Sequence, residues 1–239
     1  MKTIHLRKLS AIMEVKTKAL FSKNFVIMPL FTIGFTFVFK LVYGSIGASE
    51  AVNTAVLSLG VVMNICMTGV YCIAATLAEE KEKHTLRTLM TSSVNGMEFF
   101  LGSLLPVVAM MMVIHGILPL IVDVGMNAAQ WGSYLIITTL ASVCGCMIGM
   151  IVGIFAKNQV SASTLSTPAI LIFMMIPMFS QFHPFIETIS KFLFTGVASH
   201  VVQNMTGSLD MMDVGVLVVE IVLSTLLFVM LYRKNGFEA

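Results

Sequence analysis

Long stretches without any charged residue divide this chain of 239 residues. Four such gaps separate consecutive charged positions at Glu50 and Glu79, Glu98 and Asp123, Asp123 and Lys157, and Lys157 and Glu187. Each gap exceeds the roughly 20 residues that an α-helix needs to cross the hydrocarbon core of a bilayer. The gaps also lack the period-two alternation of barrel strands. The pattern therefore predicts an all-α membrane protein.

Six membrane spans are predicted within a single transmembrane domain that covers residues 1–239. The predicted spans are residues 25–46, 53–78, 99–122, 133–156, 166–180 and 214–232. Residues 181–210 are apolar only in patches, so we expect them to dip into the outer leaflet and return, as a re-entrant helical segment before the last span. Such irregular backbone is tolerated at membrane depth when protein buries it.

The first 23 residues are predicted to form an amphipathic helix at the membrane interface. Leu6, Leu9, Met13 and Leu20 fall near one face, which Lys16 interrupts. Basic residues surround that face, as in helices that lie on an anionic leaflet. An ordinary positively charged flank before the first span is the alternative interpretation.

The distribution of basic residues predicts the orientation. Basic residues precede the first span, follow the second and the fourth, and follow the last: Lys2, Arg7, Lys8, Lys16, Lys18, Lys23, Lys81, Lys83, Arg87, Lys157, Arg233 and Lys234. Cytoplasmic loops carry such an excess, so both termini are expected in the cytoplasm. Charged residues make up only 11% of the chain and hydrophobic residues 57%. This composition excludes a soluble domain, which carries about 25% charged residues.

The sequence shows no enzyme signature. No glycine is followed by lysine, so there is no phosphate-binding loop, and neither H-E-x-x-H nor G-x-S-x-G occurs. Cys66, Cys72, Cys144 and Cys146 all lie inside apolar runs without neighbouring ligands. They are interpreted as small buried residues, and no metal site is predicted.

Three polar residues inside the predicted spans are candidates for a translocation pathway: Glu220, His115 and Asn64. A carboxylate in lipid costs several kcal/mol unless it faces protein or water, so Glu220 is the first candidate. A helix-packing hydrogen bond, or a shallow position near the outer interface, would equally explain it.

The fourth span carries small residues at a strict spacing of four, namely Ala141, Gly145, Gly149 and Gly153. This spacing places all four on one helix face and allows another helix to approach closely. It predicts tight helix packing and gives no information on a substrate.

The most informative segment is the loop at residues 79–98. Acidic residues lead it and basic residues follow, as a helix dipole favours. Leu86, Leu89 and Met90 form a small apolar face at i, i+3 and i+4. A short amphipathic helix at the cytoplasmic surface is suited to docking into a groove on a soluble partner. A solvated loop is the alternative.

This loop resembles the cytoplasmic loop of ABC-2-type transporter permeases, which reads E-x-E-x-x-T-L-x-x-L-x-x-S-P and is soon followed by G-K. The matching residues are Glu80, Glu82, Thr85, Leu86, Leu89 and Ser92. Ser93 replaces the proline, and Gly102-Ser103 replaces Gly-Lys. The resemblance extends to the layout of the whole chain, although only the loop is motif-specific.

The resemblance implies a permease subunit of a bacterial exporter in the cytoplasmic membrane. Its substrate would be a hydrophobic or amphipathic peptide, drug or lipid, or sodium. The loop would be the coupling helix, with Glu80, Glu82, Thr85, Leu86, Leu89 and Met90 facing a separate ATPase. Two ATPase copies would bind ATP and Mg, and a second permease subunit, identical or homologous, would complete the complex. No cofactor is expected on this chain, and no nucleic acid.

A second hypothesis is an ion-coupled secondary transporter or channel that uses Glu220 and His115. This hypothesis accounts for the spans and leaves the loop motif unexplained. A third is a membrane scaffold without transport.

Overall fold

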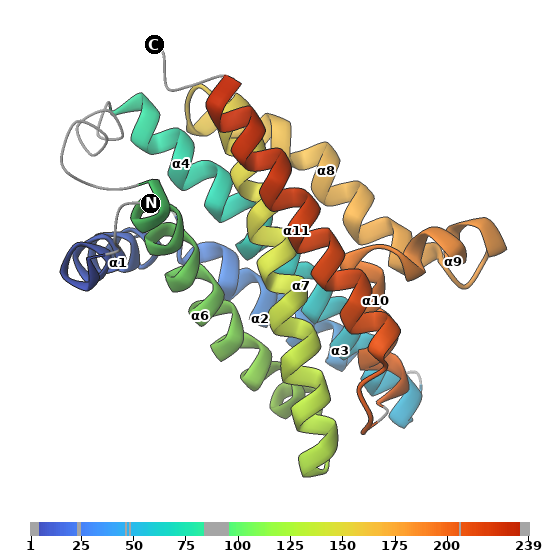
Figure 1. The fold of residues 1–239 in the computed structure, drawn as a ribbon. Helices are drawn as coiled ribbons and strands as arrows, with labels where there is room; N and C mark the ends of the chain where they lie inside the picture. Colours follow the sequence, from blue (N-terminus) through green and yellow to red (C-terminus); the bar gives the residue numbers. More distant parts are fainter. Residues whose placement is uncertain are drawn as a thin grey trace.

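The computed structural model describes residues 5–22, 25–45, 47, 49–83, 96–205 and 207–234. Every regular element in these ranges is a helix (Figure 1). In chain order they are α1 (Leu6–Leu20), α2 (Ile27–Gly44), α3 (Glu50–Asn64), η1 (Ile65–Cys72), α4 (Ile73–Glu82), α6 (Gly96–Val122), α7 (Ala128–Phe155), α8 (Gln159–Phe179), α9 (Pro184–Lys191), α10 (Phe194–Asn204) and α11 (Met211–Lys234).

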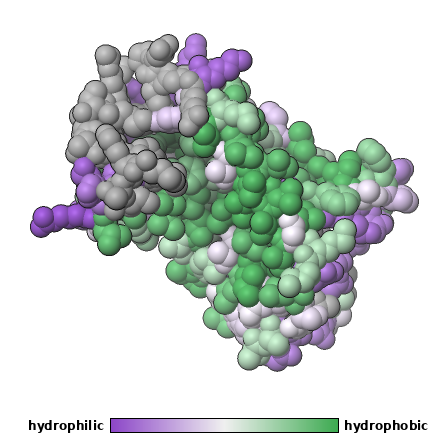
Figure 2. Space-filling model, viewed as in Figure 1, coloured by the Kyte–Doolittle hydropathy of each residue, from purple (hydrophilic) through white to green (hydrophobic). Residues whose placement is uncertain are grey.

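Six of the described helical segments are long and apolar enough to cross a membrane: Ile27–Gly44, Glu50–Glu82, Glu98–Val122, Ala128–Phe155, Gln159–Phe179 and Met211–Tyr232. The prediction of an all-α membrane protein with six spans is confirmed. Figure 2 shows apolar residues covering the middle of the visible face, with hydrophilic residues gathered towards its ends. That distribution is the one a bilayer requires.

Two spans begin at least five residues earlier than the sequence pattern indicated. α8 starts at Gln159 rather than near residue 166, because the Asn158 side chain accepts a hydrogen bond from the backbone N–H of Ser161 and caps the helix. Its early hydroxyl groups bond within the helix, as Thr164 does to the Val160 carbonyl. α7 starts at Ala128 rather than at residue 133, where Asn127 and Gln130 form a reciprocal capping box.

The second span is the centre of the bundle. α3, η1 and α4 form one helix from Glu50 to Glu82. In its most apolar stretch of 18 residues, 83% of the residues are buried inside the protein. The corresponding shares are 17% for α2, 22% for α8 and 11% for α11, which therefore lie at the periphery. The eight residues of η1 are π-helical. This conformation is rare in proteins, and where it occurs it is often at a functional site.

The N-terminal helix is present, but its inner face differs from the predicted one. α1 packs along α6 and buries Ile12, Lys16 and Leu20, whereas Leu6 is 79% exposed. Ile12 lies against Gly102, where an added β-carbon would stand 2.6 Å from its methyl group. The lysine that interrupts the apolar pattern is thus part of the packed face.

The segment before the last span contains the expected re-entrant element. α9 and α10 meet at an angle of 99°. α10 has 11 residues, about 16 Å of helix, and is too short to cross a core of about 30 Å. At the bend Gly196 lies against the backbone carbonyl of Ser190, leaving no room for a side chain. Eight of the 11 residues of α10 are buried in the bundle, so protein covers most of this segment.

Candidate functional site

The candidate site lies at the end of α4, directly before the predicted coupling segment. Glu80 forms an ion pair with Lys16 of α1, with 2.5 Å between the Lys16 Nζ and a carboxylate oxygen. The Lys16 ammonium also stands 4.8 Å from the centre of the Phe99 ring on α6, a cation–π contact. Burial lowers the pKa of Lys16, and the Glu80 carboxylate opposes that shift. One lysine therefore joins α1 to both α4 and α6.

The next two residues of α4 hold the turn between α7 and α8. The Lys81 Nζ donates to the carbonyls of Gly153, Ile154 and Ala156, at 2.9, 2.5 and 3.2 Å. These carbonyls end α7, where a cation complements the negative end of the helix dipole. Glu82 accepts a hydrogen bond of 3.2 Å from the backbone N–H of Gln159, the first residue of α8. The last turn of α4 is thus bonded to three other helices.

The start of α6 is tied to the same N-terminal helix. Glu98 is fully buried and accepts a hydrogen bond of 2.7 Å from the backbone N–H of His5, the residue that caps α1. Through Glu98 and Lys16, α1 contacts both α6 and α4, the helices that flank residues 83–95. Any displacement of that segment would therefore act on α1 as well as on the two spans.

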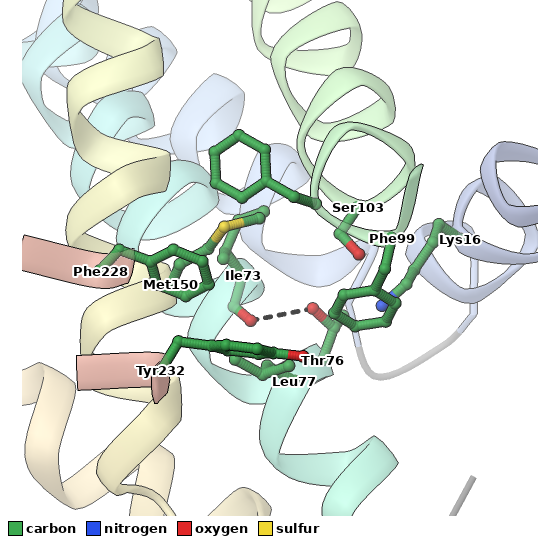
Figure 3. Close-up of a pocket in the computed structure, with 10 residues that line it drawn as sticks. Lys16, Ile73, Thr76, Leu77, Phe99, Ser103, Met150, Phe228 and Tyr232 are labelled. Atoms are coloured by element: carbon green, nitrogen blue, oxygen red, sulfur yellow. Dashed lines mark hydrogen bonds between the residues drawn. The ribbon is translucent and has the colours of Figure 1, made fainter. Parts of the chain in front are cut away.

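A small cavity lies beside this junction (Figure 3). Lys16, Phe99 and Ser103 line one side of it, with Met150, Phe228 and Tyr232 opposite. Its free space accommodates roughly one water molecule, too little for a transported substrate. The Ser103 hydroxyl is buried without a hydrogen-bond partner among the described residues. The junction is therefore a packing contact between helices, and the cavity beside it is not a substrate pocket.

The predicted coupling residues divide between the described and the undescribed parts of the chain. Glu80 and Glu82 lie on α4 with the contacts given above, whereas Thr85, Leu86, Leu89 and Met90 lie outside the described residues. Sequence reasoning missed Lys16, Lys81 and Glu98 as members of this junction. A lysine on the apolar face of a helix was the available signal for Lys16, because a buried ammonium needs a partner.

The small residues of α7 face the central helix along its length. A β-carbon on Gly149 would lie 2.5 Å from the Val70 carbonyl oxygen and 2.8 Å from that of Gly69, both in η1. Gly145 meets Ile65 in the same way, and Gly153 meets Leu77 of α4. Ala141, one turn further from the α4 end, is fully buried. These small residues allow the π-helical backbone of η1 to approach α7 closely.

The three polar residues inside the spans occupy separate environments. Asn64 donates to the Met111 carbonyl at 3.3 Å and accepts from Thr68 at 2.9 Å, a satisfied packing position. His115 is fully buried beside Tyr134, whose hydroxyl donates to the His115 carbonyl. Glu220 lies on α11, and one of its carboxylate oxygens is buried without a hydrogen-bond partner among the described residues. Within the part of the chain that the structure describes, no hydrogen bond or ion pair joins Asn64, His115 and Glu220. These described residues therefore do not form a proton or ion relay.

A double-mutant cycle tests the Lys16–Glu80 pair. Either Lys16→Met or Glu80→Gln alone should lower the free energy of unfolding by about 3–5 kcal/mol, because each leaves a buried charge without its partner. The double variant should recover part of that loss. The measurement is the apparent Tm in detergent, followed by size-exclusion chromatography. Strictly additive losses would contradict a coupled pair.

The family profile described as "ABC-2 family transporter protein" matches residues 25–231, which include all six candidate spans apart from the last residue of the sixth. No curated protein matches the sequence. Because the match covers most of the chain, this multi-pass membrane protein belongs to the ABC-2 family of transporter proteins, as a transmembrane permease subunit.

Proposed function

We propose that the chain is the permease of an exporter that is driven by ATP hydrolysis in a separate ATPase subunit. The observation that supports this most is the junction at the end of α4. Glu80, Lys81 and Glu82 connect that helix to α1, to the end of α7 and to the start of α8. A segment held between α4 and α6 would transmit a push from a soluble partner into several spans at once.

The proposed partner docks on residues 83–95, with Leu86, Leu89 and Met90 as its apolar contacts. Two ATPase chains bind ATP and Mg, and two permease subunits, identical or homologous, form the membrane part. This chain contributes no catalytic group and acts through a conformational change. The proposed cargo is a hydrophobic or amphipathic peptide, drug or lipid, or sodium, moved out of a bacterial cell.

The experiment that tests this function is an ATPase assay on the purified complex in proteoliposomes. A panel containing a hydrophobic peptide, a lipophilic drug, phospholipid and sodium would be added in turn. At least one class should stimulate hydrolysis in the complex and leave the ATPase alone unaffected. If every class leaves hydrolysis unchanged while the complex is intact, the proposed cargo classes are wrong.

We also propose that both termini lie in the cytoplasm. A single cysteine at Ala239, in a variant without Cys66, Cys72, Cys144 and Cys146, should resist a membrane-impermeant maleimide in intact cells. It should react after the membrane is permeabilised. Labelling from outside in intact cells would invert or alter the topology.

A further inference from the structure

Three polar residues follow one face of the re-entrant helix α10. Thr195, Ser199 and Gln203 are spaced four apart, so their side chains stand one above another along the helix. Val197 and Val201 each come two residues after a member of this set, which places them on the opposite face, and both are buried. We call Thr195, Ser199 and Gln203 the polar stripe of α10.

The polar stripe is hydrogen-bonded to α3, along which α10 packs (Figure 1). The Oγ of Ser58 on α3 lies 2.8 Å from the Oγ of Ser199. The Gln203 Nε2 donates to both hydroxyl oxygens, at 3.1 Å to Ser199 and 3.4 Å to Ser58. The Gln203 Oε1 accepts a bond of 3.2 Å from Gln181, an exposed residue between α8 and α9. Hydrogen bonds therefore run without a break from an exposed side chain to the fully packed Ser58.

The two ends of α10 lie at different depths in the bundle. Met205, which directly follows the helix, accepts a hydrogen bond of 2.8 Å from Gln130 at the start of α7. Phe194, the first residue of α10, meets α7 well inside its length, where a β-carbon on Gly145 would lie 3.7 Å from the Phe194 ring. In the proposed orientation α7 starts at the outer surface. The polar stripe then begins at that surface with Gln203 and ends in the interior with Thr195.

The inner end of the polar stripe has an unsatisfied hydroxyl group. Thr195 is fully buried, and its Oγ1 has no hydrogen-bond partner among the described residues. A buried hydroxyl without a partner costs free energy, and ordered water is the common partner where protein provides none. A helix that only packs against its neighbours would have an apolar residue here, as it does at Val197. The hydroxyl indicates contact with water or with a polar ligand.

We propose that the polar stripe of α10 is a route by which water and the polar part of an amphipathic cargo pass between the outer surface and the interior, and that Gln203 closes it. Polar residues within membrane-spanning regions often mark substrate pathways. The stripe and Ser58 offer only uncharged hydroxyl and amide groups, whose bonds to one another exchange readily for bonds to water. They suit neutral polar groups such as hydroxyls and amides. Passage of water is independent of the proposed transport function, whereas passage of cargo rests on it.

Cysteine accessibility tests the route in the full-length protein. In a variant without the native cysteines, Thr195→Cys, Ser199→Cys and Gln203→Cys would each be treated in intact cells with a small membrane-impermeant methanethiosulfonate. Val197→Cys and Val201→Cys are the controls, because their exposures of 1% and 8% match the 0% of Thr195 and the 5% of Ser199. Thr195→Cys and Ser199→Cys should each react at least about tenfold faster than their valine partners, since a hydrated face opens to solvent more often than an apolar one.

A second substitution tests whether Gln203 closes the route. Gln203→Ala removes all the side-chain hydrogen bonds of this amide. It should raise the reaction rate of Thr195→Cys about tenfold, because several weak bonds between helices are lost together. Asn204→Ala, at the exposed neighbouring position, is the control and should leave the rate unchanged.

Two results would overturn the proposal. Equal rates for the stripe cysteines and their valine partners would show that water does not follow this face of α10. An unchanged rate of Thr195→Cys after Gln203→Ala would show that Gln203 does not close the route. Should Ser199→Cys fail to fold, Ser58→Cys and its equally buried control Val56→Cys test the same face from α3.

The role in cargo passage has a separate readout. In the complex with the ATPase, modification of Thr195→Cys should abolish substrate-stimulated ATP hydrolysis, whereas the same treatment of Val197→Cys should not. Retained stimulation after complete modification of Thr195→Cys would overturn the cargo role. If no cargo stimulates the unmodified complex, the proposed function fails, and the labelling rates still decide whether water follows the polar stripe.

Discussion

Replacing Gly149 with leucine is expected to abolish nearly all folded protein. A β-carbon alone at this position would already lie 2.5 Å from one backbone carbonyl oxygen of η1 and 2.8 Å from another. Backbone at the centre of the bundle cannot move aside as a flexible side chain can. Overpacking in cores costs about 1–3 kcal/mol, and more where the neighbour is rigid. That is a large part of the stability of a typical domain.

Gly132 provides the matched control on the same helix. It also lies in α7, and no atom stands within 4 Å of the position that its β-carbon would take. Gly132→Leu should therefore give wild-type amounts of monodisperse protein by size-exclusion chromatography after detergent extraction. Equal yields for the two leucine variants would mean that α7 does not pack through Gly149.

The double substitution of Leu86 and Leu89 by aspartate is expected to separate the permease from its ATPase. If these side chains dock in the partner, each aspartate places a charge in an apolar contact. Residues at the centre of such interfaces contribute at least ~2 kcal/mol each, so the two changes together should reduce affinity by about a thousandfold. The measurement is recovery of the ATPase with tagged permease.

Insertion into the membrane should be normal in the double variant, because the loop is predicted to lie outside the bilayer. Leu86→Met, which retains volume and polarity, is the control and should recover the ATPase fully. Wild-type recovery and wild-type export by the double aspartate variant would remove the coupling role from this segment. It would also leave the junction at α4 without a role in coupling.

The spans could be predicted from the sequence because each depends only on the apolar composition and the length of one continuous stretch. A stretch such as residues 99–122 has no charged residue, and its length matches the membrane, so burial in lipid is decided locally. The start of α8 was placed too late because Ser161, Ser163 and Thr164 reduced its apparent hydrophobicity. A hydroxyl group that donates to a carbonyl of its own helix costs little free energy in lipid, because its hydrogen bond is made within the helix. The Thr164 hydroxyl donates to the Val160 carbonyl in this way.

The junction at α4 could not be predicted, because it depends on contacts between distant residues. Lys16 and Glu80 lie on different helices, and nothing local to Lys16 identifies its partner. The π-helical turn has no sequence pattern that we recognise, although the glycine stripe of α7 indicated a close neighbour.

The central claim is that this permease works with a separate ATPase, and its most direct test is co-purification from native membranes. The tagged chain, expressed in its native cells, would be extracted in mild detergent and its complex weighed by native mass spectrometry. The account predicts a complex with two ATPase chains and two permease subunits that hydrolyses ATP. A permease that is consistently recovered in folded form without any ATPase would contradict it.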